Sequence, residues 1–313
     1  MLPVQTVKTS NTGAPPGAGS VRRMSLDSTH ATATGHDEGS SAPDAEFPPP
    51  APLSDSDARP GRSRSRRGAA SDGEVIVRRR DWRLGGRTVR PWRERVLAVA
   101  LLGVGIGILL GTALTTFLPT AWAGLAATAV LWLGMLVPIV WAFTHSRPVG
   151  LLRLSMLDLV WAIGLGLLLR MTQGWLEVAV GASGALPSYP SIGGQLPQGW
   201  IFTDVVAPVV IAPVLEEFFF RAVVLVSVYT LLRRAIGKSM AGVTAVLVSA
   251  ALFVLLHSLT SALSVDQVIS LSLLGMVCGL LVALTGRIWP AVLTHVVYNG
   301  TFVVLALAGT YLG

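Results

Sequence analysis

The sequence predicts an all-α fold: a polytopic membrane bundle of about seven transmembrane helices behind a disordered N-terminal tail. The 313-residue chain is 52% hydrophobic and only 13% charged, about half the charge of an ordinary soluble domain. Its mean hydropathy is +0.62. Residues 1–95 hold 16 of the 24 Lys and Arg and 11 of the 17 Asp and Glu. The chain therefore divides into a polar leader and an apolar body.

Residues 1–92 are predicted to form a disordered, basic, cytoplasmic tail. They are rich in Ser, Pro, Gly and Ala, a composition that buries too little apolar surface to offset chain entropy. Arginine runs at 62–67 and 78–95 lead into the first apolar segment, where the positive-inside effect acts. We interpret them as a membrane anchor with Trp82 and Trp92 at the lipid interface, and we expect no nucleic-acid partner.

Seven apolar segments follow the tail, each long enough or nearly so to cross about 30 Å of hydrocarbon. They are Val96–Leu118, Trp122–Phe143, Leu154–Val180, Thr203–Leu232, Met240–His257, Gln267–Leu284 and Pro290–Leu312. Backbone groups in lipid must be satisfied within the segment, so we expect helices. Residues 93–202 should hold the first three helices and an outer loop, and residues 203–313 a membrane core.

The charges of the connecting loops predict the orientation in the cell membrane. Alternate connections carry all the Lys and Arg of the loops: Arg147, Arg153, Arg233, Arg234, Lys238 and Arg287. The connections at 119–121, 181–202 and 258–266 contain neither residue type. By the positive-inside rule the N-terminus lies in the cytoplasm and the C-terminus outside. The long outer loop after Val180 is predicted to be a plain connector, with substrate gating as the alternative.

A Glu-Glu-x-x-x-Arg motif lies inside the fourth apolar segment, where each charge is costly. Glu217 and Arg221 are four residues apart, share one helix face and can neutralise each other. Glu216 points about 100° away and has no partner in its own helix. A structural ion pair explains Glu217 and Arg221, but it leaves Glu216 unexplained.

Two further pairs lie four residues apart on later apolar segments: Phe253 with His257, and His295 with Asn299. Intramembrane polar residues are expected to line a shared cavity. Glu216, His257 and His295 are the ligand types of a catalytic zinc site. They are equally the parts of a glutamate general base with histidine support. Both arrangements activate water and predict amide hydrolysis, with Asn299 bonding the oxyanion of the intermediate.

The stretches "APVLEEFFFR", "FVLLH" and "GRIWPAVLTHVVYNG" resemble the three motifs of the CPBP intramembrane proteases. That family includes type II CAAX prenyl endopeptidases and Abi proteins linked to bacteriocin self-immunity. The resemblance implies that residues 203–313 are the catalytic core of an intramembrane metallo- or glutamate-type endopeptidase. It implies these roles: Glu216 activates water, Glu217 is the second motif glutamate, Arg221 orders them, His257 and His295 are the essential histidines and Asn299 the last polar residue. A zinc ion on Glu216, His257 and His295 is the expected cofactor; no other cofactor site is expected.

Membrane lipid and a peptide or membrane-protein substrate are the expected partners. The main alternative is a non-catalytic membrane scaffold or bacteriocin-immunity-type factor that binds through the same polar cluster, and a proton-coupled transporter is another. Ser183 in "GASGAL" resembles a rhomboid nucleophile, but loop-forming sequence follows it. We expect that Ser183 is not catalytic.

The depth of the three motifs presents a difficulty. Glu216 and His257 lie in the outer halves of their predicted spans. His295 follows the inner Arg287 by eight residues, or about 12 Å of helix. The motifs can meet only if Arg287 lies above the inner boundary, or if the true helix ends differ from the predicted ones.

Overall fold

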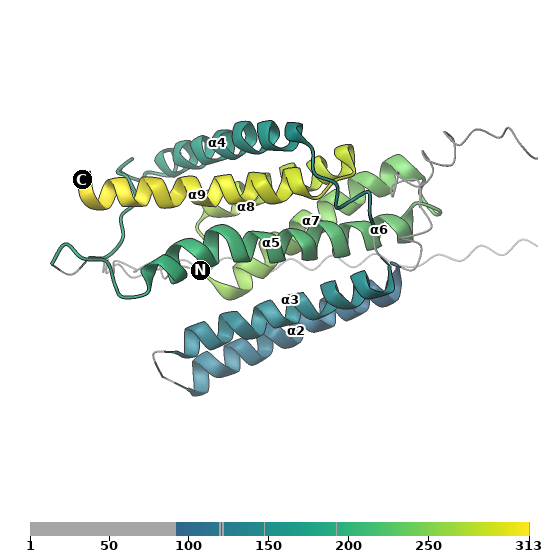
Figure 1. Cartoon of the computed structure of the whole chain (residues 1–313), viewed down its shortest axis with the longest axis horizontal. Helices are drawn as coiled ribbons and strands as arrows, with labels where there is room; N and C mark the ends of the chain where they lie inside the picture. Colours follow the sequence, from purple (N-terminus) through teal and green to yellow (C-terminus); the bar gives the residue numbers. More distant parts are fainter. Residues whose placement is uncertain (1–91, 119, 121, 147, 192, 313) are drawn as a thin grey trace, which may run out of the picture. The chain divides into compact units, whose positions relative to one another are not determined.

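The computed structural model describes residues 92–118, 120, 122–146, 148–191 and 193–312. The predicted tail, apart from Trp92, lies outside this part of the chain. The described residues form helices and no strand (Figure 1). Six helices are long and apolar enough to cross a membrane: α2 (Glu94–Phe117), α3 (Ala123–His145), α4 (Met156–Ala179), α7 (Lys238–Thr260), α8 (Val265–Thr285) and α9 (Trp289–Leu312). The predicted all-α membrane bundle is confirmed.

The fourth predicted span is a continuous helical stretch that changes its winding three times. It consists of π-helix η3 (Ile201–Ile211), α5 (Ala212–Glu217), π-helix η4 (Phe218–Val224) and α6 (Leu225–Leu232). Glu216 and Glu217 therefore end a short α-helical piece between two π-helical ones. Such π segments are rare and often mark functional sites.

Two prolines explain the winding before the glutamates. A π-helix bonds each carbonyl to the N–H five residues later, and the Ala212 N–H does bond the Ala207 carbonyl. The Pro208 carbonyl would need the N–H of Pro213, which proline lacks. The Asn299 side chain supplies it instead, because its Nδ2 donates to the Pro208 oxygen at 2.8 Å. The last motif residue thus stabilises the helix that carries the first motif.

The hairpin of α2 and α3 is held together by close backbone contact. A Cβ added to Gly103 would lie 2.6 Å from the Gly134 carbonyl oxygen, and one added to Gly134 would lie 2.5 Å from the Gly103 oxygen. Small residues at such positions allow membrane helices to approach closely. The hairpin packs against α5, η4 and α6, and Figure 1 shows it lying beside them along one flank of the bundle.

Trp92 differs from its predicted place at the lipid interface, because its side chain is fully buried. Its ring packs 5.3 Å from that of Phe143, which lies 5.8 Å from Phe218. The Thr230 hydroxyl donates to the Trp92 carbonyl. Trp92 therefore joins the start of α2 to α3, η4 and α6, which fixes one end of the hairpin.

The depth of the motifs is explained at the start of α9. Arg287 forms a bidentate pair with Asp158, with its Nη2 2.6 Å from Oδ1. Asp158 is fully buried in the first turn of α4, where it also caps the helix by accepting from the Ser155 N–H. In Figure 1, α9 begins short of the bundle end at which α6 finishes. Arg287 is therefore held at the first turn of α4, and His295, about two turns further along α9, lies beside Glu217.

The other polar residues of α4 also have partners on α8 and α9. Arg170 donates to the Tyr298 carbonyl at 3.0 and 3.2 Å and stacks over the Tyr298 ring at 4.0 Å. Gln173 donates to Glu177 at 2.8 Å and to Asp266 at 3.0 Å. These bonds explain how an otherwise apolar span tolerates ionisable residues.

Candidate active site

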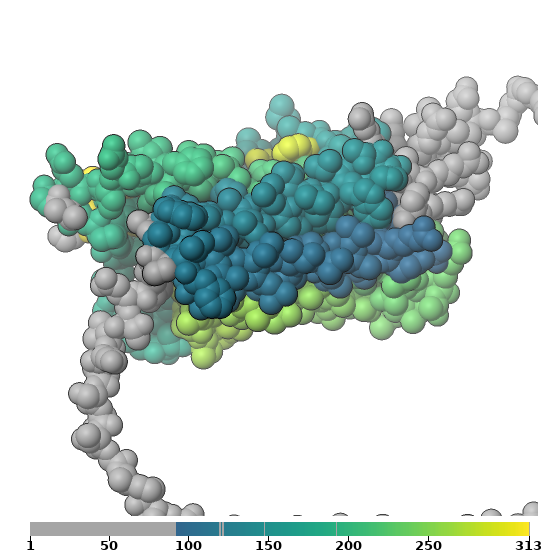
Figure 2. All heavy atoms as spheres, turned by 90° about the horizontal axis from the view of Figure 1, so that it is seen from below, coloured from purple at the N-terminus to yellow at the C-terminus, as the bar shows by residue number. Residues whose placement is uncertain are grey.

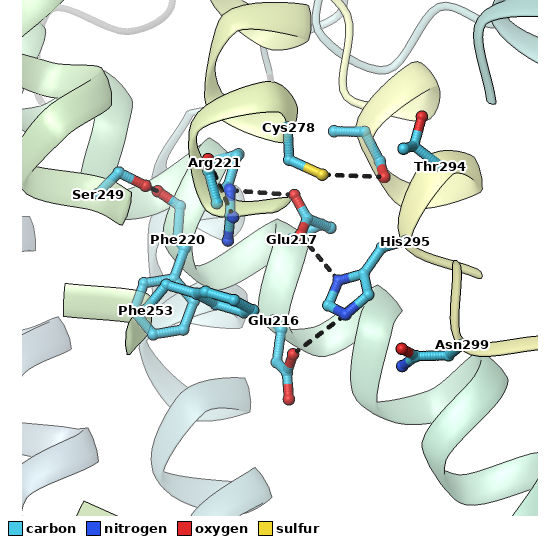
Figure 3. Close-up of polar contacts among 12 residues, drawn as sticks. Glu216, Glu217, Phe220, Arg221, Ser249, Phe253, Cys278, Thr294, His295 and Asn299 are labelled. Atoms are coloured by element: carbon cyan, nitrogen blue, oxygen red, sulfur yellow. Dashed lines mark hydrogen bonds and ion pairs between the residues drawn. The ribbon is translucent and has the colours of Figure 1, made fainter. Parts of the chain in front are cut away.

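A chain of four polar side chains joins two helical segments at the centre of the bundle. Glu217 Oε1 lies 3.0 Å from His295 Nδ1, and Glu217 Oε2 lies 3.2 Å from Arg221 Nε. His295 Nε2 lies 3.8 Å from Glu216 Oε2. Figure 3 shows the order Arg221, Glu217, His295, Glu216, with the imidazole between the two carboxylates. Every contact is short enough for direct or single-water coupling.

Arg221 is completely buried, so its charge must be compensated within the protein. Its Nη2 donates to the Gly275 carbonyl of α8 at 3.3 Å, and its guanidinium lies 4.6 Å from the Phe253 ring centroid. Its contact with Glu217 has ion-pair distance but not the alignment of a hydrogen bond. The contact is therefore mainly electrostatic, and both side chains are fully buried.

Glu216 is the most exposed member of the cluster. Its side chain is 15% exposed, compared with 3% for His295 and none for Glu217. The prediction that Glu216 lacks a partner in its own helix agrees with this geometry, because its neighbour, His295, comes from α9. Glu216 is therefore the carboxylate that a substrate or water can reach.

Phe253 packs against both histidines. Its ring centroid lies 4.5 Å from that of His257 and 5.8 Å from that of His295. His257 Nδ1 contacts the Phe253 carbonyl of its own helix at 2.9 Å. Among the described residues no hydrogen bond or ion pair joins His257 to Glu216 or His295. The structure thus brings His295 into the glutamate cluster and places His257 beside it, across an aromatic ring.

Residues 198–301, about a third of the chain, match the family profile described as type II CAAX prenyl endopeptidase Rce1-like. The matched region includes all six predicted site residues. This match supports membership of the CPBP family. The match indicates a CAAX-type membrane protease, which is a hydrolase. No curated protein and no solved structure matched the chain.

The metal ligands expected for this CPBP protein are not grouped in the structure. Within residues 92–118, 120, 122–146, 148–191 and 193–312, no three His, Cys, Asp or Glu side chains are placed so that they could hold a metal ion. Glu216 and His295 approach each other, but His257 is held by its own helix. The present arrangement of these three side chains does not fit the zinc site, which stays a prediction.

Several contacts of this CPBP site were not predicted. The sequence pairs Glu217 with Arg221 and gives no signal that α9 reaches Glu217. The Gly275 carbonyl that bonds Arg221 also comes from a helix without a motif. The amide of Asn299, predicted to bond an oxyanion, has one N–H engaged by the Pro208 carbonyl. A role with the oxyanion would need its second N–H.

Two nucleophilic side chains, Cys278 and Ser183, lie outside the polar cluster. Cys278 is fully buried in the core, and its Sγ lies 3.7 Å from the Ala291 carbonyl oxygen. Ser183 lies exposed in the loop between α4 and η3, where its Oγ accepts from the Ala185 N–H. It is thus bonded by a neighbouring backbone group, as expected of a loop serine.

Proposed function

We propose that this CPBP protein is an intramembrane endopeptidase in which Glu216 activates the hydrolytic water with His295 as its partner. The observation that carries the proposal is the buried chain from Arg221 through Glu217 and His295 to Glu216. It ends at the only member of the cluster with appreciable exposure.

Arg221 and Glu217, at one end of the polar cluster, would set the tautomer of the His295 imidazole. Arg221 pairs with one oxygen of Glu217, and the other oxygen accepts a hydrogen bond from the Nδ1–H of His295. A carboxylate on one ring nitrogen fixes the tautomer and stabilises the imidazolium when it forms. The Nε2 lone pair of His295 then faces Glu216. In this scheme Glu217 and Arg221 are positioning residues.

His295 and Glu216, at the other end of the cluster, would carry out the hydrolysis of the peptide bond. A water molecule can hydrogen-bond both Glu216 Oε2 and His295 Nε2, because these atoms are 3.8 Å apart. Glu216 takes one proton from this water while the water oxygen attacks the carbonyl carbon of the peptide bond. The C–N bond then breaks, and the leaving amine takes the proton from Glu216. The products are a free amine and a carboxylic acid terminus, which releases its remaining water-derived proton to solvent, and the enzyme returns to its starting state.

The remaining motif residues would act on the intermediate. The second N–H of Asn299 could donate to the oxyanion. His257 has Nδ1 engaged with the Phe253 carbonyl, so its Nε2 is the nitrogen available for substrate. The expected substrate is a peptide or membrane protein, and the expected orientation is N-terminus in the cytoplasm and C-terminus outside.

Cleavage by the full chain in liposomes tests the proposal. Quenched fluorescent apolar peptides are incubated with the protein, and the fragments are identified by mass spectrometry. We expect Glu216→Gln to lower kcat about 10²- to 10⁴-fold without loss of folding, and Ser183→Ala to retain wild-type cleavage. If Glu216→Gln cleaves normally, the mechanism is wrong. If the wild type cleaves no peptide and both Glu216→Ala and His295→Ala keep full cellular function, the scaffold alternative is correct.

A further inference from the structure

A cavity of about 860 Å³ lies between the α2–α3 hairpin and the helix that carries the glutamates. Most of its lining is apolar or small, including Gly107, Gly111 and Ala127 of the hairpin. The far wall comes from η3 and the start of α5, with Thr260 from the end of α7. Figure 2 views the molecule from the side of the hairpin, which covers this face of the bundle.

One stripe of the composite helix leads from this cavity to the active site. Asp204, Pro208 and Ala212 all line the cavity, and Glu216 is the next residue at the same spacing of four. In a π-helix, which has more residues per turn than an α-helix, residues four apart stay close to one face. The lining of the cavity therefore ends at Ala212, one turn before Glu216 on the same stripe.

The size of the cavity favours an extended occupant. A spanning helix about 10 Å wide and 30 Å long occupies on the order of 2,400 Å³, almost three times the volume available. An extended segment of a few residues fits, and only an unwound segment exposes its carbonyl groups for hydrolysis. The volume also lies within the usual range of ligand sites.

The backbone of η3 favours a peptide over a lipid chain. Pro208 has no N–H, so the π-helical ladder has no donor for the carbonyl of Thr203, five residues earlier. Thr203 lines the cavity. The equivalent carbonyl of Pro208 receives its bond from the Asn299 amide. A peptide N–H in the cavity could do the same for Thr203, whereas an alkyl or isoprenoid chain has no donor.

Asp204 favours a basic group in that peptide. Its half-buried carboxylate accepts one hydrogen bond, from the Thr203 hydroxyl at 2.7 Å, and none of the described residues that line the cavity is Lys or Arg. The loop 181–200 contains no charged residue either. Burial and then the Asp204 carboxylate raise the pKa of Tyr189 in this loop. The negative field of Asp204 is therefore not neutralised by its neighbours.

The distance from Asp204 to Glu216 sets the spacing. Twelve residues of helix span about 18 Å, which corresponds to about five residues of extended chain. We propose that the cavity binds the substrate as an extended apolar peptide with a Lys or Arg about five residues from the scissile bond, paired with Asp204. The spacing from the scissile bond rests on the proposed function, whereas the binding of the peptide in the cavity does not depend on it.

Peptide binding to the inactive Glu216→Gln protein in liposomes tests the inference without requiring cleavage. The probes are fluorescent peptides of Leu, Ala and Val that carry one Lys, Gln or Glu at a varied position. We expect the Lys peptide to bind about tenfold more tightly than the Gln peptide, as for a partly buried charge pair. Adding Asp204→Asn should remove this preference, and adding Asp204→Lys should transfer it to the Glu peptide.

Glu177→Gln is the matched control. Glu177 is a carboxylate of α4 that accepts a hydrogen bond from Gln173 and does not line the cavity. This substitution should leave the Lys-to-Gln ratio unchanged. A ratio that does not respond to either Asp204 variant overturns the inference, as does full displacement of the peptide by farnesol. Asp204-dependent binding without cleavage by the wild type would instead refute only the proposed function. In wild-type cleavage, the preferred Lys position should lie about five residues from the cut.

Discussion

The Arg221→Met substitution tests the buried ion pair on which the site depends. Arg221 and Glu217 both have fully buried side chains, so no solvent screening reduces their interaction. Removing one partner of such a pair costs about 3–5 kcal/mol, because the other charge is left uncompensated. For a body of this size, each kcal/mol lowers the melting temperature by about 2–4 °C. We therefore expect Arg221→Met to melt about 10 °C below the wild type.

A double-mutant cycle separates this effect from lost packing. Glu217→Gln alone leaves the guanidinium uncompensated and should cost a similar amount. The double variant has neither charge, and it should recover most of the stability lost in each single variant. It should not recover cleavage, because His295 no longer has a carboxylate at Nδ1.

Thermal unfolding of the reconstituted full chain, followed by circular dichroism, provides the assay. The same measurement on wild type, both single variants and the double variant gives the coupling energy directly. The reasoning is refuted if Arg221→Met melts with the wild type, or if the double variant loses the sum of the two single losses. In either case Arg221 would contribute only packing.

The remaining predictions concern backbone contacts and the outer loop. Asn299→Leu leaves the Pro208 carbonyl without its donor and should cost about 1–3 kcal/mol of unfolding free energy. In a Pro213→Ala background, which restores a backbone N–H, the same substitution should cost less; equal losses would contradict the π-helical explanation. Gly309→Ala should lower the melting temperature, because a Cβ there overlaps the loop that packs on α9; a wild-type value would show that the loop is not docked. Burial and the Asp204 carboxylate raise the pKa of Tyr189, so stability should be complete below the free phenol pKa of about 10 and fall above it. Tyr189→Phe should remove that alkaline loss, and an unchanged pH profile would contradict the assignment.

The helices could be predicted from the sequence because length and hydropathy alone decide which segments can span lipid. The winding of the fourth span could not be predicted in this way, since an apolar pattern does not report which N–H bonds which carbonyl. The five-residue spacing of Pro208 and Pro213 was nevertheless a usable signal. It equals the hydrogen-bond spacing of the π-helix found there.

The candidate site was predictable as a set of residues but not as a set of contacts. Motif spacing places Glu217 and Arg221 on one face, and the structure pairs them. Spacing within a helix cannot show which carboxylate a second helix will meet, and His295 bonds Glu217 more closely than Glu216. The depth of His295 depends on the Arg287 pair with Asp158, two residues 129 positions apart.

The protonation of His295 tests the central claim most directly. With isotope-labelled histidine in the full chain, nitrogen NMR reports which ring nitrogen carries the proton, and His295→Gln assigns the signal. We predict a protonated, hydrogen-bonded Nδ1 and an Nε2 lone pair free to face Glu216, with this pattern lost in Glu217→Gln. A neutral ring protonated at Nε2 in the wild type would contradict the account, because Glu217 would then not orient the imidazole.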